Sequence, residues 1–152
     1  MREILFRGQV RKKGQMVRMD GTPVDGEWVY GGVLQGVGDF SVIYGGKNQN
    51  DYGEDLQKWC VYTDTLGQFT GLTDKNGKKI FEGDIVRILG NQDVEDWKNV
   101  DYTALIAFLD GGFCAIDGTI EEHGFRRYAL ARMDFDMEVI GNIHDNPELL
   151  GG

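Results

Sequence analysis

Hydrophobic and polar side chains alternate with a period of two along much of this chain. Near the N-terminus, Ile4, Phe6 and Val10 alternate with arginine and glutamine, which is the pattern of a strand with one buried face. Comparable patterns predict strands at residues 28–34, 40–44, 59–63, 85–89, 102–109, 113–116 and 136–143. The pattern therefore predicts a mainly β protein with little helix.

Turn and loop signals separate these predicted strands. Residues 110–112 (DGG) predict a hairpin between two strands, and residues 45–55 are polar and rich in Gly, Asn and Asp, which predicts a loop. Residues 126–134 fit either a short helix or a strand, and the pattern does not decide between them. Near the C-terminus, Asn146 as N-cap and Pro147 at the first helical position predict a terminal turn of helix.

One block, residues 69–86 (FTGLTDKNGKKIFEGDIV), has the layout of two strands joined by a tight turn. Asn76-Gly77 is a strong hairpin signal, because both central residues of a type I′ turn need positive φ and Asn and Gly tolerate it. Gly83 interrupts the following strand pattern and predicts a β-bulge or a sharp bend. We interpret the charged residues of this block as turn chemistry and as a source of solubility.

Three segments of the chain resemble the YopX family of small bacteriophage and prophage proteins. They are the N-terminal MREILFRG, the block at residues 69–86, and residues 138–150 (EVIGNIHDNPELL), while residues 9–68 and 90–137 are similar only loosely. Within these segments we interpret eleven positions as a structural signature of the family: Gly71, Asp74, Asn76, Gly77, Glu82, Gly83, Asp84, Gly141, Asn142, Asn146 and Pro147.

The resemblance implies a mainly β fold with an SH3-like barrel and an additional, smaller β region. We expect one domain over residues 1–152, with a possible N-terminal β subdomain at about 1–60 and the barrel at about 61–150. The family has no settled activity, so the resemblance assigns no catalytic residues. If the signature is structural, Gly77, Gly83 and Gly141 should matter for folding.

The chain is acidic, with a net charge of −9 over 152 residues. This charge argues against sequence-independent binding of nucleic acid, which needs Lys and Arg to neutralise phosphates. It would suit a basic partner, although a source of solubility is the commoner explanation of such a charge. Local basic patches are the exception, and they supply speculative binding residues: Arg11, Lys12, Lys13, Arg126 and Arg127.

Cys60 and Cys114 each lie in an apolar run, and we expect both to be reduced core thiols of a cytosolic protein. No stretch approaches the roughly 18 apolar residues of a membrane-spanning helix, and no signal peptide is visible. We therefore expect the protein to stay in the cytoplasm of a bacterial host.

The sequence contains no strong catalytic or metal-binding motif. His123 and His144 are the only histidines, and neither has a partner at a recognised metal-ligand spacing. We therefore predict no metal and no cofactor. The remaining enzymatic alternative is a metal-dependent nuclease in which Asp84, Asp96 and Lys98 hold a divalent ion and position a water.

Several aromatic residues suggest a further kind of binding surface. Trp28, Tyr30, Phe40 and Tyr44 could form a stacking platform for single-stranded nucleic acid or a proline-rich peptide. We favour the alternative in which most of them fill the core. Tyr52 and Trp97 lie in polar segments, so they are the better candidates for exposed aromatic residues, and Trp97 is retained as a speculative binding residue.

These observations favour a non-enzymatic β module that acts by binding a host protein or by self-assembly into a homo-oligomer. The first alternative is a protein associated with nucleic acid through its local basic patches, and the second is the nuclease described above. We expect no contact with membranes.

Overall fold

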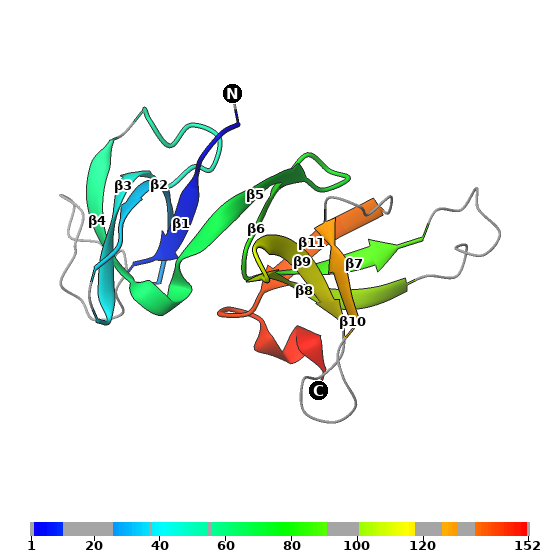
Figure 1. Ribbon diagram of the computed structural model, residues 1–152. Coiled ribbons are helices and arrows are strands. Elements are labelled where there is room, and N and C mark those ends of the chain that lie inside the picture. Colours follow the sequence, from blue (N-terminus) through cyan, green and yellow to red (C-terminus); the bar gives the residue numbers. More distant parts are fainter. Residues whose placement is uncertain are drawn as a thin grey trace. The chain divides into compact units, whose positions relative to one another are not determined.

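The computed structural model describes residues 2–10, 26–36, 38–54, 56–90, 101–117, 126–130 and 136–151 (Figure 1). Most of these residues lie in strands, and the helical segments among them are single 3₁₀ turns. The strands form two antiparallel sheets, so the prediction of a mainly β fold is confirmed. The chain divides into two compact units, Met1–Phe69 and Thr70–Gly152.

The first unit contains β1 to β4, one 3₁₀ turn and the start of β5, and its strand order is β4-β3-β2-β1-β5. An isolated antiparallel bridge between Val10 and Val61 also joins the residue after β1 to β4. The elements are β1 (Phe6–Gln9), β2 (Trp28–Leu34), β3 (Phe40–Gly46), β4 (Gln57–Tyr62), η1 (Thr63–Thr65) and β5 (Gly67–Thr73).

The core of the first unit consists of alternate side chains on one face of its strands. Phe6, Val33 and Leu66 pack against the edge of this core. Complete burial of one large apolar side chain in this core contributes about 1.5–3 kcal/mol to the stability of the fold. The buried members are Val10, Val29, Ile43, Trp59 and Val61.

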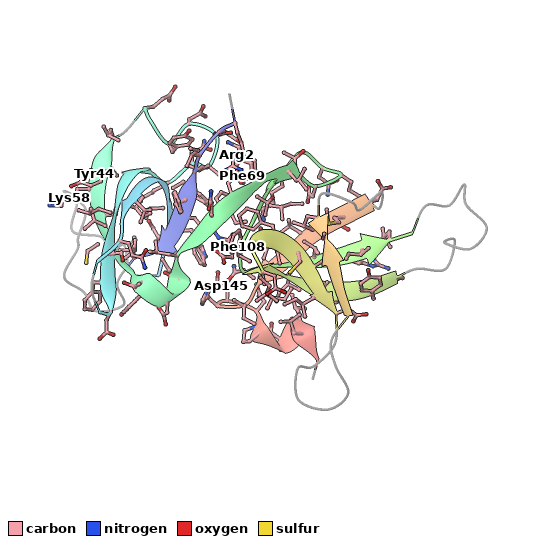
Figure 2. The ribbon with its side chains drawn as sticks, in the orientation of Figure 1. Arg2, Tyr44, Lys58, Phe69, Phe108 and Asp145 are labelled. Carbon is pink, nitrogen blue, oxygen red and sulfur yellow. The ribbon has the colours of Figure 1, made fainter. Side chains whose placement is uncertain are left out.

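The aromatic residues that we expected in the core lie on the opposite face of these strands. Trp28 and Tyr30 alternate with buried Val29, and Tyr44 follows buried Ile43. Figure 2 shows Tyr44 and Lys58, which are paired in the β3–β4 register, on the same side of the sheet. The expectation was wrong because a period of two defines two faces without saying which one is buried, and here the β-branched residues occupy the inside.

The second unit contains the end of β5 and the remaining strands. Its large sheet has the order β10-β9-β8-β7-β11, while β6 follows β5 in the first sheet. Residues 126–129 form a strand, which decides that part of the choice left open for residues 126–134, and residues 131–134 lie outside the described residues. The elements are β6 (Lys79–Phe81), β7 (Asp84–Leu89), β8 (Asp101–Leu109), β9 (Gly112–Asp117), β10 (Arg126–Ala129), β11 (Asp136–Asn142) and η4 (Pro147–Leu150).

The second unit has its own hydrophobic core, to which five of its strands contribute. Cys114 on β9 is buried as predicted, whereas Cys60 on β4 is only half-buried, and both are free thiols. Tyr102, Phe113 and Val139 pack against the edge of this core. Its buried members are Ile80, Val86, Ile88, Ala104, Ile106, Ala115, Leu130 and Met137.

The hairpin between β5 and β6 has a different turn from the one predicted. Asp74 N–H donates to Lys78 O (2.7 Å) and Gly77 N–H donates to Asp74 O (3.0 Å), which makes a three-residue loop. Gly77 has φ +81°, but Asn76 is not among the described residues with positive φ. The loop is therefore a type I turn followed by a left-handed glycine, and the predicted type I′ turn is wrong.

The hairpin between β8 and β9 does have the two-residue geometry. Leu109 pairs with Gly112, and the two residues between them, Asp110 and Gly111, have φ values of +51° and +81°. Positive φ at both central residues is the requirement of a type I′ turn. The hairpin predicted at this Asp-Gly sequence is confirmed.

Candidate functional site

The structure does not bring the predicted basic residues together. Arg11, Lys12, Lys13 and Trp97 lie outside the described residues. The backbone of Arg126 and Arg127 forms part of β10, but their side chains are not described. These residues stay candidates from the sequence alone.

The nuclease alternative also lacks an assembled site in the described residues. Asp84 is 1% exposed, and its Oδ2 accepts a hydrogen bond from the Phe81 N–H at 2.8 Å. Asp96 and Lys98 lie outside the described residues. No group of three or more His, Cys, Asp or Glu residues suited to a metal ion occurs in the part of the chain that the structure describes. The Asp84 carboxylate therefore stabilises the backbone of the turn between β6 and β7.

Gly83 lies in that turn with φ +89°, which is the left-handed region that favours glycine. Its N–H donates to Ile106 O at 2.8 Å, and its carbonyl accepts from the Ile143 N–H at 2.9 Å. The sharp bend predicted here is observed as a tight turn. The β-bulge in this part of the sheet lies elsewhere, in β11 between Val139 and Gly141.

Asp74 fastens the β5–β6 turn to β11. Its Oδ1 accepts from the N–H groups of Asn76 and Lys78, both at 2.9 Å, and its Oδ2 accepts from the Val139 N–H at 3.0 Å. Lys75 N–H also donates to Met137 O at 2.9 Å. Burial by itself raises the pKa of Asp74, but the three backbone N–H groups stabilise the carboxylate more strongly and lower its pKa overall.

The C-terminal signature residues hold a second compact turn. Asn142 Oδ1 accepts from the N–H groups of His144 and Asp145, both at 3.0 Å. Pro147 begins η4 and Asn146 is at its N-cap position, as predicted, although the helix is a 3₁₀ turn. The Asn146 side chain does not cap this turn, and its Oδ1 instead accepts from the Asn142 N–H at 3.4 Å.

Three further signature positions serve the same turns. Gly71 has φ +89° within β5, so a side chain there would be strained. The Asn76 side chain reaches Glu138 Oε1 on β11 at 3.5 Å. Glu82 lies half-buried in the β6–β7 turn. Most of the described signature residues therefore lie at turns and strand ends, while Gly71 lies within β5.

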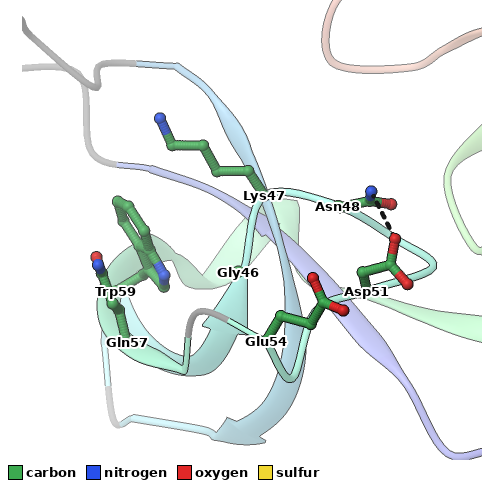
Figure 3. Close-up of a pocket in the computed structure, with 7 residues that line it drawn as sticks. All are labelled: Gly46, Lys47, Asn48, Asp51, Glu54, Gln57 and Trp59. Carbon is green, nitrogen blue, oxygen red and sulfur yellow. Dashed lines mark hydrogen bonds between the residues drawn. The ribbon is translucent and has the colours of Figure 1, made fainter.

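A pocket of about 380 Å³ lies in the first unit, where β3 ends and β4 begins (Figure 3). Trp59 and Gln57 form one side of it, Asp51 and Glu54 form the other, and Gly46 lies between them. The pattern of residues predicted a polar loop at residues 45–55 but no pocket. The lining residues are Gly46, Lys47, Asn48, Asp51, Glu54, Gln57 and Trp59.

The wall of the pocket is fixed by Trp59, which is 7% exposed. Its indole Nε1–H donates to Gly45 O at 3.0 Å, so the orientation of the ring is set by the backbone of β3. Lys47 Nζ lies 5.9 Å from the ring centroid and forms an ion pair with Glu27 Oε2 at 2.9 Å. The positive charge at the pocket is therefore balanced by a neighbouring carboxylate.

The opposite side of the pocket is a short loop held by its own hydrogen bonds. Asn48 Oδ1 accepts from the Asn50 N–H at 2.8 Å, and Asn48 Nδ2 donates to Asp51 Oδ2 at 3.2 Å. Glu54 N–H donates to Asp51 O at 3.2 Å. Asp51 and Glu54 are exposed, so two carboxylates stand at the rim and its net charge is negative.

Tyr52 extends from the same loop towards the N-terminal segment. Its hydroxyl donates to Glu3 Oε1 at 3.2 Å. Burial, the hydrogen bond to Glu3 and the charge of that carboxylate together raise the pKa of Tyr52 above its usual value. Tyr52 is half-buried rather than fully exposed, and it ties the loop to the start of the chain.

The described residues define a small, mainly β protein with an acidic, tryptophan-walled pocket on one of its two units. The model of the family described as YopX protein matches residues 6–151, so the chain belongs to the YopX family. No curated protein matches the chain.

Among solved structures, the chain is similar to the crystal structure of protein EF1440 from Enterococcus faecalis. The two sequences are 32% identical, and the match covers 62% of this chain and 69% of that one, with a TM-score of 0.36. Within the residues that the structure describes, no helix has the length and hydropathy needed to span a membrane.

Proposed function

We propose that this protein is a non-enzymatic binding module of phage or prophage origin. It binds a protein partner at the pocket bordered by Trp59, which we call the Trp59 pocket. The observation that carries the proposal is the pocket itself, whose indole wall is already oriented by Gly45. A wall and a rim that are ordered before binding reduce the entropy lost when a partner is held. The acidic net charge of −9 supports a partner that is itself basic.

The chemistry of the lining favours binding over catalysis. None of the described lining side chains is Ser, Thr, Cys or His, and the lining groups that can act as acid, base or nucleophile are Lys47, Asp51 and Glu54. Lys47 is engaged by Glu27, and Asp51 is hydrogen-bonded to Asn48. These contacts shape a surface, and they do not form a nucleophile–base pair.

We also propose that the fold includes an SH3-like barrel. Two features support it, one in each unit. The bridge between Val10 and Val61 brings β4 against the end of β1, beyond the pairing expected of an open sheet. The bonds of Asp74 and Lys75 to β11 attach the β5–β6 turn to the outer edge of the large sheet. Closure of this kind removes exposed strand edges.

The binding function is tested by capture from nuclease-treated bacterial lysate, with quantitative mass spectrometry of the bound proteins. The pocket variant carries Asp51→Asn and Glu54→Gln, which remove both rim carboxylates with little change in volume. The matched control carries Asp39→Asn and Asp64→Asn, two exposed carboxylates of the same unit outside the pocket lining. Both variants change the net charge equally.

We expect a protein that is enriched by the natural chain and by the control variant but depleted from the pocket variant. Equal capture of every bound protein by the natural chain and the pocket variant would contradict the proposal. Light scattering after size-exclusion chromatography is measured in parallel. A dimer that dissociates in the pocket variant alone would identify the partner as a second copy of the chain.

A further inference from the structure

We infer that the occupant of the Trp59 pocket is a cationic side chain, lysine or arginine, presented by a basic segment of the partner. This inference rests on the proposed function and names the chemistry that the site selects. Its argument has three parts, which are the charge at the rim, the size of the cavity and the nature of the wall.

The rim charges select against anions. The ammonium group of Lys47 is held 2.9 Å from Glu27, so that pair has no net charge. Asp51 and Glu54 remain, and both are exposed on the side of the cavity that faces Trp59 (Figure 3). A carboxylate or phosphate entering the cavity would meet two like charges, whereas an ammonium or guanidinium group would meet two opposite ones.

The size of the cavity is sufficient for a long side chain. Its volume of about 380 Å³ is near the lower end of the range of about 300–1,000 Å³ that ligand pockets occupy. The cavity is open to solvent through the exposed residues Asp51, Glu54 and Gln57. An extended segment can therefore stay outside while a single lysine or arginine enters with its charged end first.

The wall is an aromatic face with a hydrogen-bonded edge. Tryptophan is the strongest aromatic partner for a cation, and cation–π contacts form within about 6 Å of the ring centroid. Lys47 Nζ lies 5.9 Å from that centroid, at the outer limit of this range, and is paired with Glu27. Trp59 is 7% exposed, so the aliphatic stem of an entering lysine or arginine would contact the small part of the indole that the core leaves uncovered. The pocket thus combines an apolar wall with an anionic rim, as a long basic side chain requires.

The inference is tested by titrating the full-length, ¹⁵N-labelled chain with capped pentapeptides of sequence Gly-Ser-Xaa-Ser-Gly. Xaa is arginine, lysine, citrulline or glutamate, and citrulline is a neutral analogue of arginine. The indole N–H signal of Trp59, assigned through Trp59→Phe, reports occupancy of the pocket. We expect saturable shifts with the arginine or lysine peptide, and at least several-fold weaker binding of the citrulline and glutamate peptides.

Removal of the rim carboxylates should weaken binding of the cationic peptides. Loss of two exposed charge pairs corresponds to about five- to tenfold in affinity. We expect this loss in Asp51→Asn with Glu54→Gln, and no comparable loss in the control Asp39→Asn with Asp64→Asn. Equal binding of the arginine and citrulline peptides would overturn the inference. So would equal weakening in both variants, because general charge attraction would then explain the binding.

This experiment separates the inference from the proposed function. A lysate protein lost only from the pocket variant, together with no response of Trp59 to any cationic peptide, would leave a binding module whose pocket selects another chemistry. Failure of both the capture and the titration would remove the pocket as the functional site.

Discussion

Replacing Asp74 with alanine should destabilise the second unit strongly. Three backbone N–H groups, on Asn76, Lys78 and Val139, lose their acceptor in this variant. A hydrogen bond to a charged group contributes about 1.5–3 kcal/mol, but water can replace the acceptor at the two exposed turn positions. We therefore expect a loss of about 3 kcal/mol of unfolding free energy, most of it from Val139, and a fall in Tm of about 6–12 °C.

The loss of unfolding free energy in Asp74→Ala should depend on pH, in a direction that the pKa of Asp74 determines. Burial raises this pKa, the three backbone hydrogen bonds lower it, and the net result lies below the ordinary value of 3.8. The folded state therefore favours the carboxylate, and its stabilisation is complete above the pKa of the unfolded chain. The stabilisation is lost as the pH falls through the lower pKa of the folded state. Asp74→Ala should thus cost less near pH 3 than at pH 7.

The assay is urea denaturation of the natural chain and Asp74→Ala at pH 7 and pH 3, combined with hydrogen exchange of the Val139 amide. Exchange at Val139 should accelerate in the variant, because this amide loses its acceptor on Asp74. Asp136→Ala, at an exposed position of β11, is the matched control and should behave as the natural chain. A loss below about 0.5 kcal/mol at pH 7, or an equal loss at both pH values, would refute the reasoning.

Three further predictions concern turns and surface charge. Gly83→Val should lower Tm by several degrees in thermal denaturation, because a β-branched residue is strained at φ +89°; an unchanged Tm would remove this argument. Gly141→Ala should cost about 1 kcal/mol in the same assay, because a Cβ there would approach the C-terminal turn to 2.6 Å, whereas Gly112→Ala meets open space and should cost less. The exposed ion pair of Arg87 and Asp101 (2.7 Å) should show a small coupling free energy in a double-mutant cycle of stability. Salt screens exposed charges, so a coupling free energy that persists in 1 M salt would contradict this prediction.

Local sequence signals predicted the strands and one hairpin well. Alternation placed a strand at residues 28–34, and β2 has those bounds. Asp110 and Gly111 form the predicted hairpin because both residues tolerate positive φ. These features depend on the conformational preferences of neighbouring residues, so a single sequence contains the information they need.

The turn at Asn76-Gly77 shows how one side chain can override such a preference. The Asp74 carboxylate accepts the N–H groups of Asn76 and Lys78, and these bonds favour a three-residue loop over the two-residue type I′ turn. The position of Val139, far along the chain, completes the arrangement through Asp74 Oδ2. Asn-Gly alone could not reveal this contact.

The pocket was not predictable because its contacts are non-local and its residues form no motif. Trp59 meets the carbonyl of Gly45 through the β3–β4 pairing, and Lys47 reaches Glu27 before β2. The alternation in residues 59–63 indicated a strand, but it did not show that the Trp59 ring would border a cavity. Only the register of β3 and β4, in which Ile43 pairs with Trp59, places the ring beside the loop.

The family signature and the pocket occupy different parts of the chain, and this separation bears on function. In the described residues, Asp74, Asp84 and Asn142 direct their side-chain oxygens to backbone N–H groups of the second unit. The pocket residues lie between Gly46 and Trp59, in the first unit, where the resemblance to the family is loose. A signature that acts at turns specifies a scaffold and places no requirement on the rim of the pocket. If the pocket binds a partner, as we propose, we expect proteins that share this scaffold to differ in the partners they bind.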